Sequence, residues 1–588
     1  MMKRSSYIPL LLLCAATAQA QNLSTEITVD RTVVPAERAA TRLGSVHPSI
    51  LTAQVAPARI GMTEYDAPGT VTRSARTLAP AAWADTFAIS PYRGYASIGY
   101  FPTYNLGISA GYRIIQSSDT RLGVWAQFDG SSYSRRLLKD SYDKTTFRNN
   151  TVAVGADFDH RFGSHGTLTA EASYSYGSIA APIRRCAGEH GIGMADVSVA
   201  WYGRASRIGY HVGAELHTFG YSENDKNDPA PDGRAGSALL HTARKGTELE
   251  IAFGTGLVAR LGGKGSGQHL GLELKADFLK RPEATVPAID FIAGGQGGAY
   301  YGMMSSPAST LGVVSITPYY ALGRGKGFNM RLGARIDLST GGDDKKFHIA
   351  PAVRVGYNTS GFAIYARAGG GEVLNTGRSL YNYTPYMPVG WQYGRSHLPL
   401  TVDAGINIGP FAGFGAELFG GWARANDWLM PAAVGFYSAP RGVFRATDIK
   451  GFHAGARLRY AYRSIADAMV SAEFAPQKEN SGYYMWRDRA KLVLKAEVAV
   501  RPIARLELKA SYELRNGRAC YIYNNPDEAP MRFKMGNASL LGFSARYAVT
   551  PAIDVFARGE NLLASRYLVL PEVVAQGVHG LVGASIKF

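Results

Sequence analysis

The stretch "KLVLKAEVAVRPIARLELKASYEL" (residues 491–514) places an apolar residue at every second position through two successive segments. The apolar set is Leu492, Leu494, Ala496, Val498 and Val500, then Leu506, Leu508, Ala510, Tyr512 and Leu514 after a turn predicted at Arg501-Pro502. The opposite set carries the charges of Lys491, Lys495, Glu497, Arg505, Glu507, Lys509 and Glu513. A period of two predicts a β-hairpin with one apolar and one polar face. Either a protein core or lipid must cover the apolar face.

The composition limits the class of protein. The chain has 588 residues, of which 46% are hydrophobic and 19% charged, with 68 glycines and 34 tyrosines. That length exceeds one ordinary soluble core, and the charge content is too high for a helical membrane protein. No stretch after the N-terminus qualifies as a membrane helix. A formal net charge of +17 would favour a nucleic-acid partner in a cytosolic protein.

The N-terminus argues against a cytosolic location. "MMKRSSYIPLLLLCAATAQA" joins a basic start to a short apolar centre and the small-x-small site Ala18-Gln19-Ala20, which predicts a secretory signal peptide over residues 1–20. We therefore expect no nucleic-acid partner. Residues 21–90 show no strong periodicity and are expected to form an irregular periplasmic extension. Cys186 and Cys520 remain after cleavage, and the sequence leaves open whether they pair.

Connection lengths alternate along the rest of the chain. From Gly94 onward about twenty-two alternating segments follow one another. Every second connection is very short, as at Gly409-Pro410, Arg463-Ser464 and Thr550-Pro551. The connections between them are mostly long, namely 134–146, 179–192, 223–245, 281–307, 370–397, 425–445, 476–488, 517–534 and 563–578. Outer-membrane barrels have short periplasmic turns and long extracellular loops, whereas a secreted β-sandwich or propeller array has no reason to sort its loops in this way.

The predicted strands suit a bilayer. Each is about the nine to eleven residues that a tilted strand needs to cross the hydrocarbon. A one-residue slip of the 491–514 hairpin would turn its charges toward lipid, at about 2–4 kcal/mol for each Lys or Arg near the midplane. The sheet must also close, because an open edge leaves backbone groups unsatisfied in hydrocarbon. We predict an all-β, antiparallel up-and-down transmembrane barrel of about 22 strands over residues 91–588, in the outer membrane of a Gram-negative bacterium.

The C-terminal segment carries a family resemblance. "FARGENLLASRYLVLPEVVAQGVHGLVGASIKF" contains Asn561-Leu562, then Tyr567, a loop with Pro and Gly, and a last strand that ends in Lys587-Phe588. This segment resembles the C-terminal signature of TonB-dependent receptors, and general features of the chain resemble the Bacteroidota members of that family. The resemblance implies a 22-stranded barrel that acts in nutrient transport.

The region before the barrel departs from that family. Such receptors carry a plug domain of more than about a hundred residues, preceded by a box that contacts TonB, and barrels of this size are normally plugged. Here only about seventy residues separate the predicted cleavage site from the first strand. We therefore expect no plug domain, and a role for TonB stays open. The lumen would then be open, filled by its own loops or N-terminal segment, or occupied by a partner.

Motif searches give little sign of chemistry. The sequence has no G-x-S-x-G, H-E-x-x-H or Walker motif, so we expect no enzymatic activity, cofactor or metal. The loop "ENDKNDPAPDG" (223–233) clusters Glu223, Asp225, Asp228 and Asp232 with Asn224 and Asn227. Oxygen-rich loops can hold Ca²⁺, but this one lacks the terminal bidentate Glu of an EF-hand and is better interpreted as a solvated loop.

An aromatic loop is the candidate ligand site. "SLYNYTPYMPVGWQYG" (379–394) brings together Tyr381, Tyr383, Tyr386, Trp391 and Tyr393. Such rings could stack on a sugar or another ligand that enters from outside. The alternative is an aromatic belt at the bilayer edge, where Tyr and Trp are common.

Two functions follow from these patterns. The first is transport of a nutrient across the outer membrane together with a separate partner that gates the barrel. The second is a structural scaffold that anchors periplasmic or surface proteins. Expected partners are outer-membrane lipids, the phosphates of lipopolysaccharide that basic side chains could contact, and a lipoprotein or periplasmic protein.

Overall fold

The structure, a computed structural model, describes most of the chain from residue 91 onward. The described residues are 91–102, 104–136, 144–180, 189–224, 245–262, 267–282, 284–290, 300–306, 309–323, 327–341, 346–383, 385–386, 394–434, 441–479, 486–487, 490–522, 531–570 and 573–588. The predicted signal peptide, the N-terminal extension and the question of a plug lie outside these residues. Within them, the helices are α5 (Gly377–Tyr383) and the short 3-10 helix η2 (Gly163–His165), and no helix is long and apolar enough to cross a membrane.

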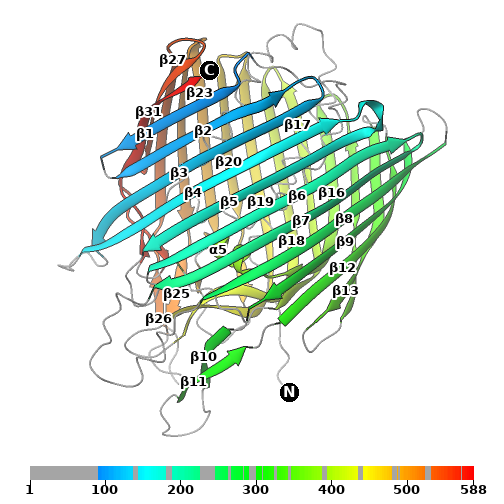
Figure 1. Ribbon diagram of the computed structural model, residues 1–588, viewed down its shortest axis with the longest axis horizontal. Helices are drawn as coiled ribbons and strands as arrows, with labels where there is room; N and C mark the ends of the chain where they lie inside the picture. The colour runs from blue at the N-terminus through cyan, green and yellow to red at the C-terminus, as the bar shows by residue number, and fades with distance from the viewer. Residues whose placement is uncertain are drawn as a thin grey trace.

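One antiparallel sheet forms the barrel wall (Figure 1). In chain order its segments are β1 (Gly94–Phe101), β2 (Asn105–Gln116), β3 (Thr120–Arg136), β4 (Lys144–Arg161), β5 (Gly166–Ala180), β6 (Glu189–Ala205), β7 (Ile208–Asn224), β8 (Lys245–Leu261), β9 (Gln268–Arg281), β12 (Ser309–Leu322), β13 (Gly327–Thr340), β14 (Phe347–Pro351), β15 (Val353–Asn358), β16 (Phe362–Leu374), β17 (Arg395–Phe411), β18 (Phe414–Val434), β19 (Arg441–Tyr462), β20 (Ala466–Phe474), β21 (Gln477–Glu479), β23 (Leu492–Ile503), β24 (Leu506–Asn516), β27 (Ala538–Ala548), β28 (Ile553–Glu560) and β31 (His579–Lys587). Short strands in the connections are β10 (Ala284–Asp290), β11 (Tyr300–Ser306), β22 (Trp486–Arg487), β25 (Ala519–Ile522), β26 (Met531–Lys534), β29 (Leu568–Leu570) and β30 (Val573–Val574).

The wall has 22 strands and closes on itself. Its sheet contains 24 segments because two strands are interrupted, one between β14 and β15 and one between β20 and β21. A proline stands at each interruption, Pro351 and Pro476, where its missing N–H breaks the ladder. The ring closes where β31 pairs with both β28 and β1, with Tyr95 opposite Lys587 and Tyr100 opposite Val582. The predicted fold and strand number are confirmed.

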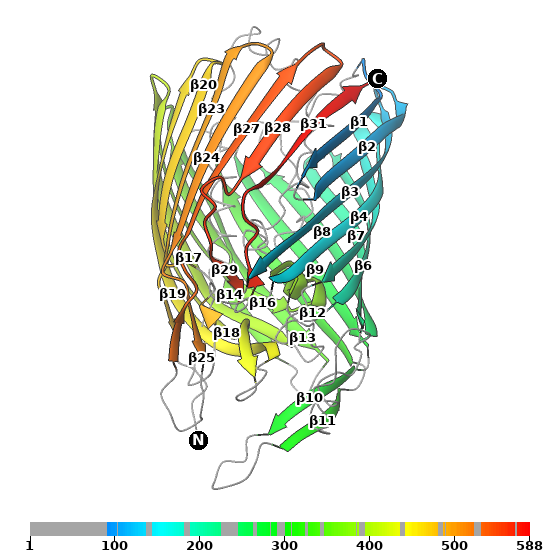
Figure 2. The same ribbon diagram turned by 90° about the vertical axis from the view of Figure 1, so that its left-hand side faces the viewer.

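Most long connections lie at one end of the barrel and the tight turns at the other, with the short β1–β2 connection (102–104) as an exception on the side of the long ones. Figure 2 shows β10–β11 and β25 beyond one end, and the C-terminus among the tight turns at the other. We call the end with the long connections the outer end. Two turns lie later than predicted, because β17 extends to Phe411 and β23 to Ile503. The predicted turn residues Gly409-Pro410 and Arg501-Pro502 are instead sites where the register shifts within the strand. Proline cannot donate to the ladder, so a bulge tolerates it better than a regular pair does.

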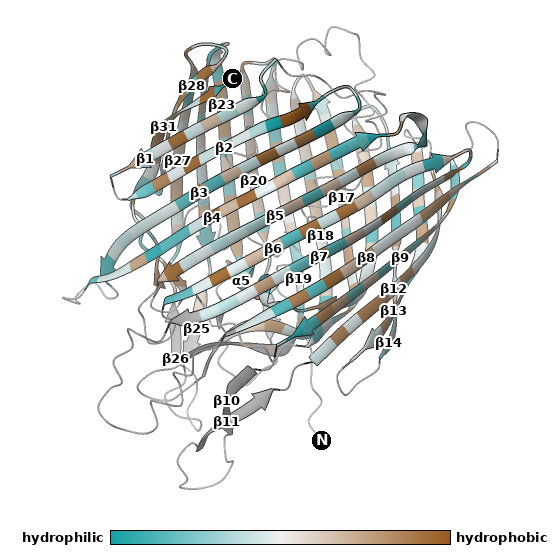
Figure 3. Ribbon diagram, in the orientation of Figure 1, coloured by the Kyte–Doolittle hydropathy of each residue, from teal (hydrophilic) through white to brown (hydrophobic). Residues whose placement is uncertain are grey.

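Side chains alternate between the outside and the lumen as the hairpin pattern predicts. In β23 and β24, Ala496 pairs with Tyr512, and Lys495 pairs with Glu513 on the other face. Val498 is 44% exposed on the outside, whereas Lys495 Nζ lies 4.0 Å from a Glu513 carboxylate oxygen in the lumen. Figure 3 shows the same alternation of hydrophobic and hydrophilic positions along the other strands. The outward face is thus apolar without a protein partner in this chain, which is the surface that lipid covers in a barrel.

Candidate functional site

Three parts of the chain at the outer end lie inside the lumen and narrow it. They are the described residues of the segment 375–394 (375–383, 385, 386 and 394), which include α5, the described residues of the segment 561–578 (561–570 and 573–578), which include β29 and β30, and the outer ends of β18 and β19. Figure 1 shows α5 behind the front wall, within the barrel. The β18–β19 pair carries a register shift between Ala425 and Trp428, with Asp427 at a φ of 54°. Because a bulge bends its strand, the outer end of this hairpin leans across the lumen (Figure 2).

The start of α5 is held by two sets of polar contacts. Thr376 and Ser379 cap it reciprocally, since Ser379 N donates to Thr376 Oγ1 at 3.0 Å and Thr376 N donates to Ser379 Oγ at 3.1 Å. The Gly377 N–H points at both carboxylate oxygens of Glu248 on β8, at 3.0 and 3.1 Å. A carboxylate at a helix N-terminus is favoured by the partial positive charge there. The helix is therefore oriented by the wall as well as by its own cap.

Arg378 holds α5 against β6 and β7. Its two terminal nitrogens contact both carboxylate oxygens of Asp196 on β6, with Nη2–Oδ2 at 2.7 Å. His217 on β7 shares this carboxylate, with Nδ1 at 2.6 Å from Asp196 Oδ1. A bidentate arginine–carboxylate pair fixes direction as well as distance. The contact is not deeply buried, because the two side chains are 19% and 27% exposed, so it can be broken at moderate cost.

An apolar cluster joins α5 to two distant parts of the wall. Leu380 is 5% exposed and packs with Ile192 and Phe219 from β6 and β7 and with Leu429 from β18. Fully burying a leucine side chain contributes about 1.5–3 kcal/mol. Since β6 and β18 are separated by many strands around the ring, this cluster spans the lumen at the level of α5.

The segment 561–578 is organised by the asparagine of the C-terminal motif. Asn561 has a φ of 48°, and its side chain donates to Ser565 O at 3.0 Å and to Gln576 O at 2.8 Å. Its Oδ1 accepts the Ser565 N–H at 2.8 Å. One side chain thus ties the beginning of the loop to its end. Tyr567, the tyrosine of the same C-terminal motif, is only 3% exposed inside the lumen.

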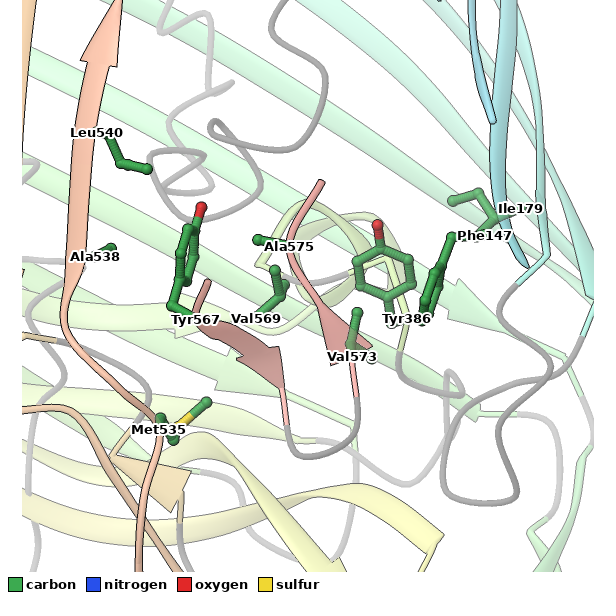
Figure 4. Packing of buried hydrophobic residues seen from close by; sticks show 10 residues of the cluster. All are labelled: Phe147, Ile179, Tyr386, Met535, Ala538, Leu540, Tyr567, Val569, Val573 and Ala575. Atoms are coloured by element: carbon green, nitrogen blue, oxygen red, sulfur yellow. The ribbon is translucent and has the colours of Figure 1, made fainter. Parts of the chain in front are cut away.

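The two inward segments meet in a second cluster (Figure 4). The cluster comprises Phe147, Ile179, Tyr386, Met535, Ala538, Leu540, Tyr567, Val569, Val573 and Ala575. In Figure 4 the Tyr386 ring lies beside Phe147, with Val573 next to it and Tyr567 on the side of β27. Phe444 on β19 packs against both this cluster and the Leu380 cluster. The outer end of the lumen is therefore filled, at least in part, by the chain's own loops.

The predicted aromatic site is only partly described. Tyr383 and Tyr386 are 6% and 3% exposed, and Tyr383 meets Phe444 edge to face with ring centres 5.9 Å apart. Tyr381 is half-buried, with its ring 6.0 Å from that of Phe219. These three rings face the lumen rather than the bilayer edge. Trp391 and Tyr393 lie outside the described residues, and stacking on a ligand stays a prediction.

Other sequence-level candidates fall in undescribed parts. Most of the acidic loop 223–233 lies there, so the Ca²⁺ interpretation stays untested, and so does pairing of Cys186 with Cys520. No sequence pattern points to Asp196, Glu248 and Arg378, which come together only because β6, β8 and the 375–394 segment meet in space. A signal for the helix start was present, since Thr376 and Ser379 have the spacing of a capping pair.

The lumen-facing wall below the loops carries paired charges. Arg367 Nε lies 3.0 Å from Asp403 Oδ2, Arg331 Nη2 lies 2.7 Å from Glu273 Oε2, and Arg457 contacts Glu417. Each of these arginines has an acidic neighbour on the wall. This part of the wall is therefore mixed in charge rather than uniformly basic, despite the net charge of +17.

Solved structures share this architecture. A mutant of the ferric enterobactin receptor PfeA from Pseudomonas aeruginosa superposes with a TM-score of 0.63 at 11% identity, over 85% of this chain and 81% of that chain. The pyoverdine outer membrane receptor FpvA from Pseudomonas aeruginosa PAO1 gives a TM-score of 0.61 at 13% identity, over 85% of this chain and 79% of that chain. The chain has the fold of these receptor barrels. No protein-family model matches the sequence, and no curated protein matches it either.

Proposed function

We propose that this chain is an outer-membrane barrel, similar to TonB-dependent receptors, that acts in transport of a nutrient with a separate partner. The observation that carries the proposal is a closed 22-stranded wall whose outer lumen is narrowed by inward segments, one of them held in part by the partly exposed Arg378–Asp196 pair. A transport barrel needs a closed state that keeps solutes out and a low-cost way to leave it. In this proposal the Arg378–Asp196 pair is the contact that releases most easily, because it is partly exposed, whereas the Glu248–Gly377 contact is buried.

The likeness to siderophore receptors supports this proposal at the level of fold. The siderophores named for those receptors are not assigned to this chain, and its substrate is left open. The proposed setting is the Gram-negative outer membrane, with lipid and lipopolysaccharide around the apolar outer face. The proposed partner is a lipoprotein or periplasmic protein, and TonB is one candidate for energy input.

Two measurements test transport together. The purified full-length chain in planar bilayers is expected to show low basal conductance with brief openings, and deletion of its gene is expected to reduce uptake of at least one nutrient. A barrel that never conducts, combined with unchanged uptake across a panel of carbon, iron and vitamin sources, would refute the proposal.

A scaffold role is the second candidate, favoured by the apolar clusters that fill the outer lumen. Tyr386, Val569 and Val573 are all nearly fully buried there, as in a permanent core. In this role the barrel would anchor a periplasmic or surface protein. A pull-down from detergent-solubilised membranes should then recover a stoichiometric partner, and recovery of the barrel alone would exclude the scaffold.

A further inference from the structure

The outer part of the wall brings two histidines and a glutamate to one point. They are His348 on β14, Glu372 on β16 and His397 on β17. His348 Nδ1 lies 2.6 Å and His397 Nδ1 lies 3.1 Å from the same atom, Glu372 Oε1. The candidate ligand atoms all lie within 4.8 Å of one another. Among the described residues this is the only such group of three.

The three atoms converge without forming hydrogen bonds. Glu372 is 3% exposed at its side chain, yet its Oε1 and both histidine Nδ1 atoms are buried and lack a hydrogen bond of acceptable geometry. The two imidazole rings are stacked, with centres 3.9 Å apart and planes 21° apart. Burying a carboxylate oxygen without a hydrogen bond costs free energy unless something else binds it. A cation between the three atoms would satisfy all of them.

An irregularity in the pairing of β16 with β17 lies next to Glu372. Upstream in β16, Tyr365 and Arg367 face the lumen while Ile364 faces outward, so an uninterrupted strand would point residue 372 toward lipid. The register shifts between Gly369 and Gly371, where Pro399 and Leu400 of β17 stand opposite Gly370 alone, and Glu372 then pairs with His397. On β16 itself the chain turns at Gly371, whose φ is 127°, and Glu372 lies on the luminal side after this turn. Bulges often lie next to functional sites.

The backbone around Glu372 is fixed by a second layer of contacts. Asp337 Oδ2 accepts the Glu372 N–H at 2.7 Å, and Asp337 Oδ1 accepts Arg335 Nε–H at 2.8 Å. Arg335 also donates to Glu372 O at 2.9 Å. Gly371 has a φ of 127°, and a Cβ there would lie 2.6 Å from the Arg335 guanidinium and the Asp337 carboxylate. Only glycine fits at position 371. The hydrogen bonds of Glu372 with Asp337 and Arg335 therefore hold the backbone of the carboxylate residue in one place.

We propose that His348, Glu372 and His397 bind a divalent first-row transition-metal ion. Two imidazole nitrogens and one carboxylate suit Zn²⁺, Co²⁺, Ni²⁺ or Fe²⁺, whereas Ca²⁺ and Mg²⁺ favour sets made entirely of oxygen. Ligand atoms about 2.0–2.2 Å from a tetrahedral metal lie about 3.4 Å apart. The distances of 2.6 and 3.1 Å to Glu372 Oε1 would therefore lengthen slightly, and the two stacked rings would turn so that both nitrogens point at the ion. Three protein ligands leave a coordination position for water or another donor.

The site has access to the lumen and lies close to the loop that narrows it. His348 and His397 are 23% and 17% exposed at their side chains, which gives an ion a path from the lumen. Glu372 lies four residues before Thr376, the N-terminal cap of α5. A bound ion would therefore join β14, β16 and β17 where the inward segment 375–394 begins and ends.

Metal binding can be measured on the purified, untagged full-length chain in detergent, after treatment with a chelator. Titration with Co²⁺, followed by visible absorption, and competition with Zn²⁺ are expected to give one saturable site per chain, which Ca²⁺ does not compete for. His348→Ala, His397→Ala and Glu372→Gln are each expected to weaken binding more than about 100-fold, because even outer-layer partners of metal ligands are worth about 10- to 100-fold. His269→Ala is the matched control, since it removes a histidine from β9 at a distance from the site.

Several outcomes would overturn the proposal. They are absence of a saturable Co²⁺ site in the stripped wild-type chain, equal affinity in His348→Ala and His269→Ala, or equally tight binding of Ca²⁺. Folding of every variant is followed by the heat-dependent mobility shift of intact barrels on gels. If the alanine variants do not fold, the nearly isosteric Glu372→Gln variant and the wild-type titration still decide the question.

Discussion

Removing the Arg378 side chain should loosen α5 from the wall. Arg378→Ala deletes two charge-assisted contacts to Asp196 but leaves the Glu248–Gly377 contact and the burial of Leu380 intact. A hydrogen bond to a charged group contributes about 1.5–3 kcal/mol. The partial exposure of both side chains lowers the combined loss to about the same range, 1.5–3 kcal/mol. A change of about 1.4 kcal/mol corresponds to a factor of ten. The fraction of time that α5 is detached from the wall should therefore rise about 10- to 100-fold.

Single-channel recording in planar bilayers is the direct assay. Arg378→Ala is expected to raise the frequency of open events by about that factor, and cells that carry it should become more sensitive to a large antibiotic normally excluded by the outer membrane. The control is Arg501→Ala, which removes an equal charge from an exposed pair with Asp467 at the opposite end of the barrel. A double-mutant cycle with Asp196→Asn isolates the pair, and the second substitution should add little to the first.

The result that refutes this reasoning is a folded Arg378→Ala barrel whose conductance matches that of wild type and of Arg501→Ala. In that case the 375–394 segment does not control the opening. The contacts that close the lumen would then lie elsewhere, and the Arg378–Asp196 pair would no longer support a role in transport.

The remaining predictions concern the stability of the wall and its loops, and each can be followed by urea titration of the gel mobility shift. Asn561→Ala should destabilise the folded barrel by about 2–4 kcal/mol, because three hydrogen bonds are lost and alanine is strained at a φ of 48°. Val498→Arg should cost about 2–4 kcal/mol by placing a charge in lipid, whereas Ser511→Arg on the luminal face of the same hairpin should be nearly neutral. Gly583→Ala should weaken the closing seam, since its Cβ would lie 2.0 Å from a β1 carbonyl oxygen, while Gly254→Ala has open space and serves as the control. Equal midpoints within either matched pair, or an unchanged midpoint for Asn561→Ala, would contradict the corresponding argument.

The wall could be predicted from the sequence because lipid imposes a simple rule. Each strand has one apolar face, the period is two, and connection length sorts by end, so the 491–514 hairpin and its relatives along the chain are recognisable without a structure. Exceptions occur where proline or glycine interrupts the ladder. Pro502 lies within β23 rather than in a turn, and the irregularity opposite Gly370, together with the positive φ of Gly371 before Glu372, leaves no trace in the periodicity.

The lumen could not be predicted in the same way, because its contacts join residues that are distant in sequence. Tyr386 packs against Phe147 and Val573, and Arg378 meets Asp196, although no local pattern relates these positions. The sequence points to Asn561 and Tyr567 through the C-terminal motif, and to Tyr381, Tyr383 and Tyr386 through the aromatic loop, but not to what these side chains contact. The structure gives Asn561 a physical role, as the side chain that fixes both ends of an inward loop.

The two candidate functions make different demands on the same lumen. A permanent scaffold core needs no exposed polar contact, yet α5 is attached to β6 by the Arg378–Asp196 pair, whose side chains are 19% and 27% exposed, as well as to β8 by the buried Glu248 and to the lumen by apolar side chains. The segment 561–578, in contrast, is tied at both ends by Asn561 and closed by a buried hairpin. The two inward segments are therefore held differently: 561–578 by hydrogen bonds at both ends, and 375–394 by buried contacts together with the partly exposed Arg378–Asp196 pair. The proposed transport role requires that this pair be the first contact to release, which the Arg378→Ala experiment tests directly.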